Sequence, residues 1–472
     1  MTSPYKLSKS DFLEYLRCPQ EFWLKHHHPE LFVTEKSLIG EHFRAQGDDV
    51  ERLARTLKIF DGKQLEYQRE FITDKLRARS DIVVTDPATG KIEIYEVKSG
   101  SKIKDEYVID VAFQKIAAER TGANVERTFV ITVDTGYVRN GDIVPDQLLR
   151  VTDVTDNVNA NQPLIEQKID EALNQLNTEP NPDITVFCAD KLECAFITHH
   201  FRDIPAYNVT HIRGIYKPKL SELIARGILD IRHVPTDFKI SERQRTQVEI
   251  AIANRPHVRA DEIKATLRAL KLPLRFFDYE TFGYAVPQYH GIKPYQHVPV
   301  QFSLHTMRGV DQLEHAYHIA GGNGVNPGME ITEALHNAIE GEIGTVVVWN
   351  ASFEKGRNRE GKELHPEFAE FLQSLNDSMF DLETIFGTLQ LYAHPGFLGR
   401  TSLKAVLPVI APHLSYNDLE IVDGQSASIR WYRMTSGKLT DDERSEIHDH
   451  LKAYCDLDTL AMVEIYKFLM KL

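Results

Sequence analysis

The chain has little cysteine, no long apolar run and no excess of positive charge. Four cysteines in 472 residues are too few for a disulfide framework, so we expect thiols or metal ligands in a reducing compartment. No apolar run is long enough to span a membrane, and the first residues lack the apolar core of a signal peptide. We therefore expect a cytoplasmic protein without a membrane partner.

The charge balance limits the kind of nucleic-acid binding that the chain can support. Its 55 Lys and Arg residues are outnumbered by 69 Asp and Glu residues, which gives a net charge of −14. This balance argues against a broad basic surface that coats nucleic acid. It does not argue against a metal-dependent nuclease, because such sites are built from carboxylates and filled by cations.

The chain also lacks internal repeats and low-complexity tracts, and its length predicts two or three domains. We expect an α/β domain over residues 1–215, a helical connector over 216–272 and a second α/β domain over 273–472. Alternating and apolar runs predict the strands of these domains. The expected strands are 71–72, 80–84, 91–98, 127–133, 274–280, 298–305 and 345–349.

Two carboxylates close the apolar run 274–280. Because strand side chains alternate between faces, Asp278 and Glu280 are expected on the same side. Two adjacent anions at the end of a buried strand are costly unless a cation holds them, and a divalent metal is the natural partner. A solvated strand end without function is the alternative for this pair alone.

Candidate partners of this pair lie downstream. Asn350 ends a predicted buried strand, and Glu354 lies in the helix that opens after it. Tyr454 and Asp458 are four residues apart in an amphipathic helix and therefore share a side. We interpret Cys455, within the same helix, as a core thiol.

This ordered set resembles the DEDDy branch of the DnaQ-like exonucleases. The resemblance implies a ribonuclease-H-like core, two Mg²⁺ or Mn²⁺ ions and 3′-to-5′ exonuclease action. Asp278 would bridge the metals, Glu280 and Asp458 would complete their shells, and Tyr454 would orient the attacking water. The chain departs from the family at Glu354, where the family has Asp, and Asp381 is a weaker stand-in for that residue.

A second constellation lies in the N-terminal region. Asp81 begins one strand of a predicted hairpin, Glu96 and Lys98 end the other on one face, and Gln114 lies on the next helix. Two acids can hold a metal while a lysine steadies a nucleophilic water or developing phosphorane charge. An exposed hairpin with a Glu/Lys pair is the alternative interpretation.

These residues, with the opening motif over 12–19, resemble the PD-(D/E)xK nucleases of the RecB type, including the CRISPR-associated ones. The resemblance implies a restriction-endonuclease-like fold and a metal site at Asp81 and Glu96, with Lys98 and Gln114 also catalytic. Relatives of this type also use an acid or histidine from an early helix, for which Glu51 is the best candidate.

The same resemblance implies an iron–sulfur cluster. In such relatives a cysteine at the position of Cys18 joins three later cysteines in holding a 4Fe–4S cluster. Here the later group is Cys188, Cys194 and His200, with a histidine where a cysteine is expected. An iron–sulfur centre can include histidine, and three thiolates with an imidazole can also hold zinc. A clasp without metal is the third alternative.

The two modules in this order resemble a group of uncharacterised bacterial proteins with a domain of unknown function at the C-terminus. The sequence therefore predicts a metal-dependent nuclease whose partner is nucleic acid, with DNA preferred over RNA. In one alternative, one site is degenerate, and the departure at Glu354 makes this the C-terminal one. In another, the protein is a non-catalytic nucleic-acid-binding or scaffold protein. The sequence leaves the oligomeric state open.

Overall fold

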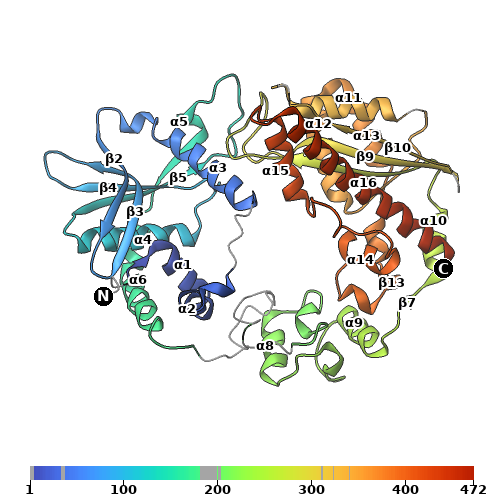
Figure 1. The fold of residues 1–472 in the computed structure, drawn as a ribbon, viewed down its shortest axis with the longest axis horizontal. Helices are drawn as coiled ribbons and strands as arrows, with labels where there is room; N and C mark the ends of the chain where they lie inside the picture. The colour runs from blue at the N-terminus through green and yellow to red at the C-terminus, as the bar shows by residue number, and fades with distance from the viewer. Residues whose placement is uncertain are drawn as a thin grey trace. The chain divides into compact units, whose positions relative to one another are not determined.

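The computed structural model describes residues 5–32, 38–180, 199, 204–309, 312–322, 324–339 and 341–472. The chain is a mixed α/β protein with open mixed sheets, and it divides into two compact units (Figure 1). The N-terminal unit comprises Met1–Arg202 and Tyr284–Gln296. The C-terminal unit comprises Asp203–Gly283 and His297–Leu472. The helices between 217 and 268 thus belong with the C-terminal unit.

The N-terminal unit is built on a sheet with the order β1-β3-β4-β5-β6, and β2 pairs with β3. The central hairpin joins β3 (Leu76–Thr85) to β4 (Ile92–Val97), and β5 (Val125–Val133) runs parallel to β4. These strands match the runs expected at 80–84, 91–98 and 127–133. The outer strands are β1 (Leu7–Ser8), β2 (Gln64–Ile72) and β6 (Leu149–Asp153).

Helix α4 (Asp105–Arg120) packs on this sheet, and α1 (Lys9–Arg17) packs against α4. Helix α1 begins with a capping box, in which Ser8 accepts from Asp11 N and the Asp11 carboxylate accepts from Ser8 N. The ring of Phe12 stacks on that of Phe113, with centroids 5.2 Å apart. The remaining helices are α2 (Pro19–His27), α3 (Leu38–Ala54), α5 (Pro145–Leu148) and α6 (Thr155–Gln175).

The segment Tyr284–Gln296 belongs to the N-terminal unit although it follows a strand of the other unit. The hydroxyl of Tyr284 donates to Asp49 Oδ2 at 3.0 Å. The guanidinium of Arg139 donates to the carbonyl oxygens of Pro287 and Gln288 at 3.0 and 2.6 Å. Polar contacts of loop carbonyls and one tyrosine therefore hold this segment to the N-terminal unit.

The C-terminal unit is built on a sheet with the order β10-β9-β8-β11-β12. Its centre is β8 (Leu274–Phe282), which pairs antiparallel with β9 (Val298–Gly309) and parallel with β11 (Thr345–Val348). Every residue of β8 except Asp278 is buried, because helices cover the sheet on which this apolar run lies. The outer strands are β10 (Gln312–Ile319) and β12 (Met379–Asp381).

The long helix α16 (Asp441–Lys471) packs across β8 and β9, and α15 (Gly424–Thr435) also packs on β8 (Figure 1). A two-stranded sheet pairs β7 (His257–Val258) with β13 (Tyr392–Ala393). The other helices of the unit are α8 (Lys217–Ala225), α9 (Glu242–Ala253), α10 (Ala260–Arg268), α11 (Pro327–Ala338), α12 (Ala351–Leu364), α13 (Ala369–Asp377) and α14 (Leu403–Ile410).

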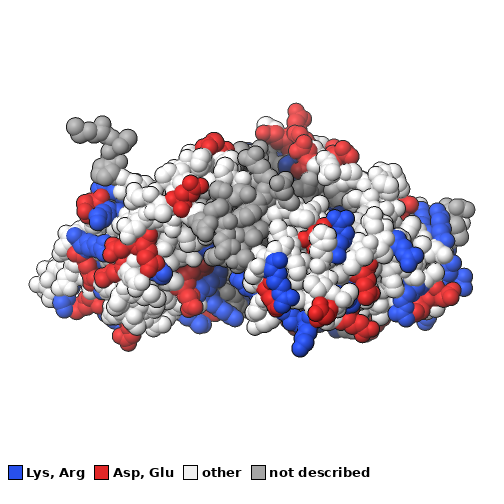
Figure 2. Space-filling model, turned by 90° about the horizontal axis from the view of Figure 1, so that it is seen from below, with Lys and Arg blue, Asp and Glu red and all other residues white. Residues whose placement is uncertain are grey.

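Basic and acidic side chains are interspersed on the face drawn in Figure 2, in keeping with the net charge of −14. None of the described helices combines the length and the apolar composition that a membrane span requires.

Candidate functional site

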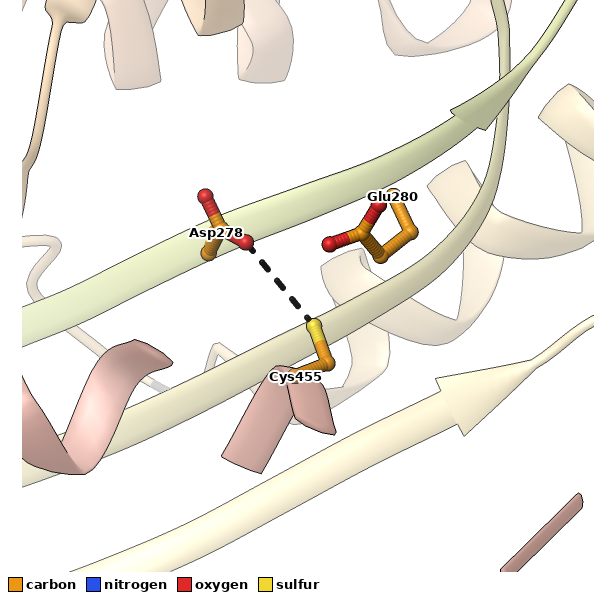
Figure 3. A group of neighbouring side chains, drawn as sticks. All are labelled: Asp278, Glu280 and Cys455. Atoms are coloured by element: carbon orange, nitrogen blue, oxygen red, sulfur yellow. Dashed lines mark hydrogen bonds between the residues drawn. The ribbon is translucent and has the colours of Figure 1, made fainter. Parts of the chain in front are cut away.

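Strand β8 presents Asp278 and Glu280 on one side, as the alternation predicts. One ligand atom from each, with the thiol of Cys455, lies within 4.8 Å of the others. Figure 3 shows the two carboxylates on the side of the strand that faces Cys455 of α16, whose Sγ is 4.0 Å from Asp278 Oδ2. Cys455 is fully buried. It is therefore a core thiol, as expected, but one that contacts the acid pair.

Helix α16 also brings Asp458 to this place. The hydroxyl of Tyr416 donates to Asp458 Oδ1. The ring of Tyr416 lies 6.2 Å from that of Tyr454, and the hydroxyl of Tyr454 accepts from Lys404 Nζ at 3.1 Å. Asp458 is 8 % exposed and Glu280 is 7 % exposed, so the carboxylates meet in a partly dry environment.

Glu354 joins the group from the first turn of α12. The chain reaches this helix through Asn350, whose φ of 77° lies in the left-handed region that asparagine tolerates. Glu354 is only 2 % exposed, and its Oε2 atom has no hydrogen-bond partner among the described residues. We name the set Asp278, Glu280, Glu354 and Asp458 the acid cluster.

Burial raises the pKa values of the acid cluster, and charges within the cluster add to the rise at Asp278 and Glu280. Burial, followed by the charges of Asp458, Glu280 and Glu354, raises the pKa of Asp278 well above its usual range. Burial and Asp458 do the same to Glu280. Burial raises the pKa of Glu354 to about 8, and the charge of Asp381 adds to this rise. The cluster thus holds more negative charge than its surroundings neutralise.

The pKa of Asp458 rises least among the four acids, because its neighbours stabilise the ionised carboxylate. Burial raises its pKa to about 6, while hydrogen bonds from Tyr416 and Tyr454 and the charge of Lys404 limit the rise. Lys404 also lies over the rings of Tyr416 and Tyr454, at 5.3 and 5.1 Å from their centroids.

These observations fit a divalent cation at the acid cluster. Such a cation would pair with the buried Glu354 oxygen that lacks a donor. It would also favour the ionised form of the four acids, whose pKa values are raised. Burial and the nearby acids raise the pKa of the Cys455 thiol well above its usual range. A protonated thiol is a poor ligand for a hard cation.

Asp381 has a structural role in place of the ligand role considered for it. Its carboxylate accepts from the backbone N–H groups of Asn350 at 3.1 Å, Ala351 at 3.0 Å and Glu383 at 3.1 Å. Asp381 therefore ties the start of α12 to the end of β12, and this contact positions Glu354 one turn later.

Sequence reasoning missed Lys404, Tyr416 and Gly424 at this site. A Cβ atom on Gly424, the first residue of α15, would lie 3.3 Å from Glu280 Oε2. Lys404 and Tyr416 lie outside the three motifs, and no local pattern marks them. The nearest signal is the apolar sequence of α14, in which Lys404 is the one charged residue.

The N-terminal constellation also comes together. Glu96 Oε1 accepts from Lys98 Nζ and from Lys9 Nζ, each at 2.7 Å, and Glu96 Oε2 accepts from Gln114 Nε2 at 2.7 Å. Asp110 pairs with the same two lysines, at 2.5 Å from Lys98 and 3.2 Å from Lys9. We name Lys9, Glu96, Lys98, Asp110 and Gln114 the lysine–acid cluster.

Asp81 lies beside the lysine–acid cluster. Its Oδ2 accepts from Val97 N at 2.7 Å, and its Oδ1 accepts from Gln68 Nε2 at 3.1 Å. The same Gln68 nitrogen donates to Glu51 at 2.6 Å, so the candidate from the early helix lies near Asp81. Burial and the charge of Glu96 raise the pKa of Asp81 to about 7.

The lysines neutralise Glu96. Burial alone would raise its pKa, but Lys98 and Lys9 outweigh burial and lower the pKa to about 2. Glu96 Oε1 accepts two hydrogen bonds and Oε2 accepts one, so a divalent metal shared with Asp81 would have to use the remaining lone pair of Oε2 or displace a lysine. Lys9 and Asp110 were not predicted as site residues, since Lys9 lies 87 residues before Glu96.

The predicted metal clasp cannot be traced in full. Cys188, Cys194 and His200 lie outside the described residues. Cys18 is described and caps α2, where its Sγ accepts from Glu21 N at 3.3 Å. The ring of His199 lies 5.5 Å from that of His28. The choice between an iron–sulfur cluster, zinc and no metal stays a prediction.

Comparison with known proteins adds one family of unknown function. Residues 275–402, which include β8 and α12, match a family model described as "Domain of unknown function (DUF2779)". The chain is 26 % identical over 231 residues to the uncharacterized protein MG366 of Mycoplasma genitalium, a match covering 45 % of this chain and 34 % of the relative. It is 27 % identical over 157 residues to the uncharacterized protein UU173 of Ureaplasma parvum, covering 30 % and 22 %. The matched region is thus about a third or less of each relative.

Proposed function

We propose that the protein is a metal-dependent nuclease whose hydrolytic centre is the acid cluster. The observation that carries this proposal is the closeness of Asp278 and Glu280, each with a carboxylate oxygen within 4.8 Å of the other's, and the presence of Glu354 and Asp458 near enough for their charges to raise the pKa of Asp278. The order of strands supports the DnaQ-like assignment, because an antiparallel β8-β9-β10 meander flanked by parallel β11 and β12 is compatible with a ribonuclease-H-like core.

Each residue has a role in this proposal. The four acids would hold divalent cations, which supply charge stabilisation for the phosphate and a water of lowered pKa. Tyr454 is held by Lys404 and lies beside Asp458, where its hydroxyl can orient the attacking water. Lys404 offsets part of the negative charge of the acid cluster and so reduces its repulsion of a phosphodiester.

The proposed substrate is nucleic acid, with DNA preferred over RNA, and the proposed action is removal of nucleotides from 3′ ends. The proposed place of action is the cytoplasm. An acid cluster that binds cations suits a chain with a net charge of −14, because the cations and not a basic surface would bring the phosphate to the site.

A RecB-like nuclease site at the lysine–acid cluster is the second proposal. It is supported by the convergence of Asp81, Glu96, Lys98 and Gln114, which three separate stretches of sequence contribute. The alternative that one of the two sites is degenerate gains support on the N-terminal side, since both oxygens of Glu96 already accept hydrogen bonds.

The test is degradation of 5′-labelled single and double strands in Mn²⁺. We expect the wild type to shorten them stepwise and Asp278→Ala to lose this activity. Asp449→Ala is the matched control, because Asp449 is an acid of α16 that is 76 % exposed. Full activity of Asp278→Ala would show that the acid cluster is not the hydrolytic centre. Binding of strands without cleavage by the wild type would favour the scaffold alternative.

A further inference from the structure

A pocket of about 300 Å³ lies in the C-terminal unit, apart from the acid cluster. It is enclosed by α9, by the segment 207–214 and by the segment 386–401. Its volume is at the lower end of the range of small-molecule sites, with room for a single nucleotide unit and not for a longer ligand.

The charge of this pocket is opposite to that of the chain. Among the described residues that line it are Arg213, Arg243 and Arg400, and none of these lining residues is acidic. Arg243 donates to the carbonyl oxygen of Thr388 at 2.8 Å, which fixes its guanidinium at the wall. Arg400 is exposed, and its charge lowers the pKa of the neighbouring His211, after burial as the main cause. Arg213 pairs with Glu383 at 3.5 Å. Arg243 and Arg400 are therefore the two arginines of the pocket that point to an anionic ligand.

One part of the pocket wall is apolar, whereas its rim is cationic. Phe386 and Phe397 line it and are only 3 and 4 % exposed, and Ile250 lines it from α9. An apolar wall beside guanidinium groups is the chemistry that a base and its phosphate require.

The walls of the pocket are held in place by contacts within the protein. Gln247 of α9 donates to His211 O at 2.7 Å and accepts from Arg213 N at 2.9 Å. Gly399 has a φ of +74°, and a Cβ atom there would lie 2.2 Å from Gln247 Nε2. Close approach of the two walls therefore requires glycine at this position.

The pocket is joined to the acid cluster by a short stretch of chain. Arg400 and Thr401 line the pocket, and the carbonyl oxygen of Thr401 accepts from Trp349 Nε1 at 3.1 Å, next to Asn350. Lys404, one turn after Thr401, reaches Tyr454 beside the acid cluster. Residues 400–404 thus link the wall of the pocket to the surroundings of the acid cluster.

We propose that this pocket binds one nucleotide of the single-stranded nucleic acid on which the acid cluster acts, with the arginines on its phosphate and the apolar wall against its base. The assignment of that ligand rests on the proposed nuclease function. The pocket fixes the strand away from the cleaved bond and so sets its register at the acid cluster.

The test is calorimetric titration of the full chain with deoxyadenosine monophosphate, inorganic phosphate and deoxyadenosine in EDTA, so that no divalent ion contributes. We expect the nucleotide to bind at least about tenfold more tightly than phosphate or deoxyadenosine alone, because it contacts both the arginines of the rim and the apolar wall. Arg400→Ala and Arg243→Ala should each weaken binding about tenfold or more, and Arg400→Lys should weaken it less. Arg308→Ala is the matched control, an exposed arginine of the same unit outside the pocket.

Three outcomes would overturn the proposal: no nucleotide binding, binding that the pocket variants leave unchanged, or phosphate binding as tight as that of the nucleotide. Circular dichroism of each variant checks that the fold is retained. Asp278→Ala should bind the nucleotide like the wild type. Should the wild type fail to cleave strands while the pocket variants lose nucleotide binding, the nuclease proposal falls and the pocket assignment stands.

Discussion

Among single residues, Glu354 bears most directly on metal binding at the acid cluster. The resemblance to the exonucleases is weakest there, because their Asp is replaced by a side chain one methylene longer. In the structure the longer side chain starts from the first turn of α12 and ends buried, with Oε2 lacking a donor. A buried unpaired carboxylate is costly, and a bound cation removes this cost. The longer side chain of Glu354 is thus compatible with the ligand role that we propose for it.

We expect Glu354→Gln to reduce the stabilisation that Mn²⁺ gives to the protein. A ligand at a hundred times its Kd stabilises the folded state by about 3 kcal/mol, which raises Tm by about 2–4 °C per kcal/mol. The variant should lose most of this shift because the amide carries no charge. Thermal melts with and without Mn²⁺ measure it, and Glu363→Gln, an exposed acid of the same helix, is the control. Equal shifts in both variants would exclude Glu354 as a ligand.

We expect Lys9→Met to destabilise the protein by about 2 kcal/mol or more, because it leaves the buried carboxylates Glu96 and Asp110 with one ammonium partner. Urea unfolding measures this change. Lys25→Met is the control, since Lys25 pairs with Glu14 on the surface and is 46 % exposed, which predicts a loss under about 1 kcal/mol. A loss in Lys9→Met no larger than in the control would show that Lys98 alone satisfies both acids.

The residues that sequence could predict are those that lie in local patterns. Asp278 and Glu280 are two apart on an apolar strand, and Tyr454 and Asp458 are four apart on a helix, so their shared faces follow from the periods of these elements. No periodicity of the sequence predicts that Lys9 or Tyr416 lies at a site. Lys9 reaches Glu96 only because α1 packs on α4, and this packing is a property of the whole unit.

Among the elements, β8 was predictable and α15 was not. The run from Leu274 to Phe282 is apolar and lies in the centre of a sheet, where strands are apolar on both faces. Helix α15 contains Gln425, Ser426, Ser428 and Arg430, and its apolar residues are too few to give a clear period. Strand β12 is three residues long and pairs only through β11, so tertiary pairing and not sequence defines it.

The packing of α16 on β9 includes a buried polar network that predicts a pH effect. His305 Nδ1 contacts Thr459 Oγ1 at 2.8 Å, and Ser303 Oγ contacts the same atom at 2.7 Å. His305 is 7 % exposed. Burial, aided by the nearby His315, lowers its pKa to about 4. The contact between the helix and the strand therefore requires a neutral imidazole.

We expect the free energy of unfolding of the wild type to fall relative to that of His305→Gln as the pH decreases from about 6.5 to about 4. The two proteins are compared because the buried carboxylates with raised pKa values act in the opposite direction in both. In this window the unfolded chain protonates His305 and the folded chain does not, so the loss is at most about 3 kcal/mol. His305→Gln should show a smaller decrease in urea unfolding at pH 4.5 relative to pH 7. Replacing the exposed His413 with Gln is the control. An unchanged pH dependence in His305→Gln would show that other groups cause it.

For the whole molecule, the two sites differ in how their charges are balanced. In the lysine–acid cluster two lysines face Glu96 and Asp110, so charge is matched within the protein. In the acid cluster Lys404 is the cation that lowers the pKa of Asp278, and three other carboxylates oppose it. Charge is therefore balanced within the protein in the first arrangement, whereas the second has an excess of carboxylates that the proposed cation would balance. The two sites are thus expected to respond differently to metal and to mutation.

Circular single-stranded DNA separates the two sites, because a circle has no 3′ end for the exonuclease proposed at the acid cluster. Any cleavage of circles in Mn²⁺ must then come from the lysine–acid cluster. We expect such cleavage, measured on gels, to persist in Asp278→Ala and to vanish in Lys98→Ala. On linear strands the effects of the two variants should be reversed. Asp278→Ala should shorten strands about a thousandfold more slowly, since metal-bound charge stabilisation contributes several kcal/mol. Lys98→Ala should retain stepwise shortening. Intact circles with every variant and the wild type would leave the acid cluster as the nuclease and make the lysine–acid cluster the degenerate site.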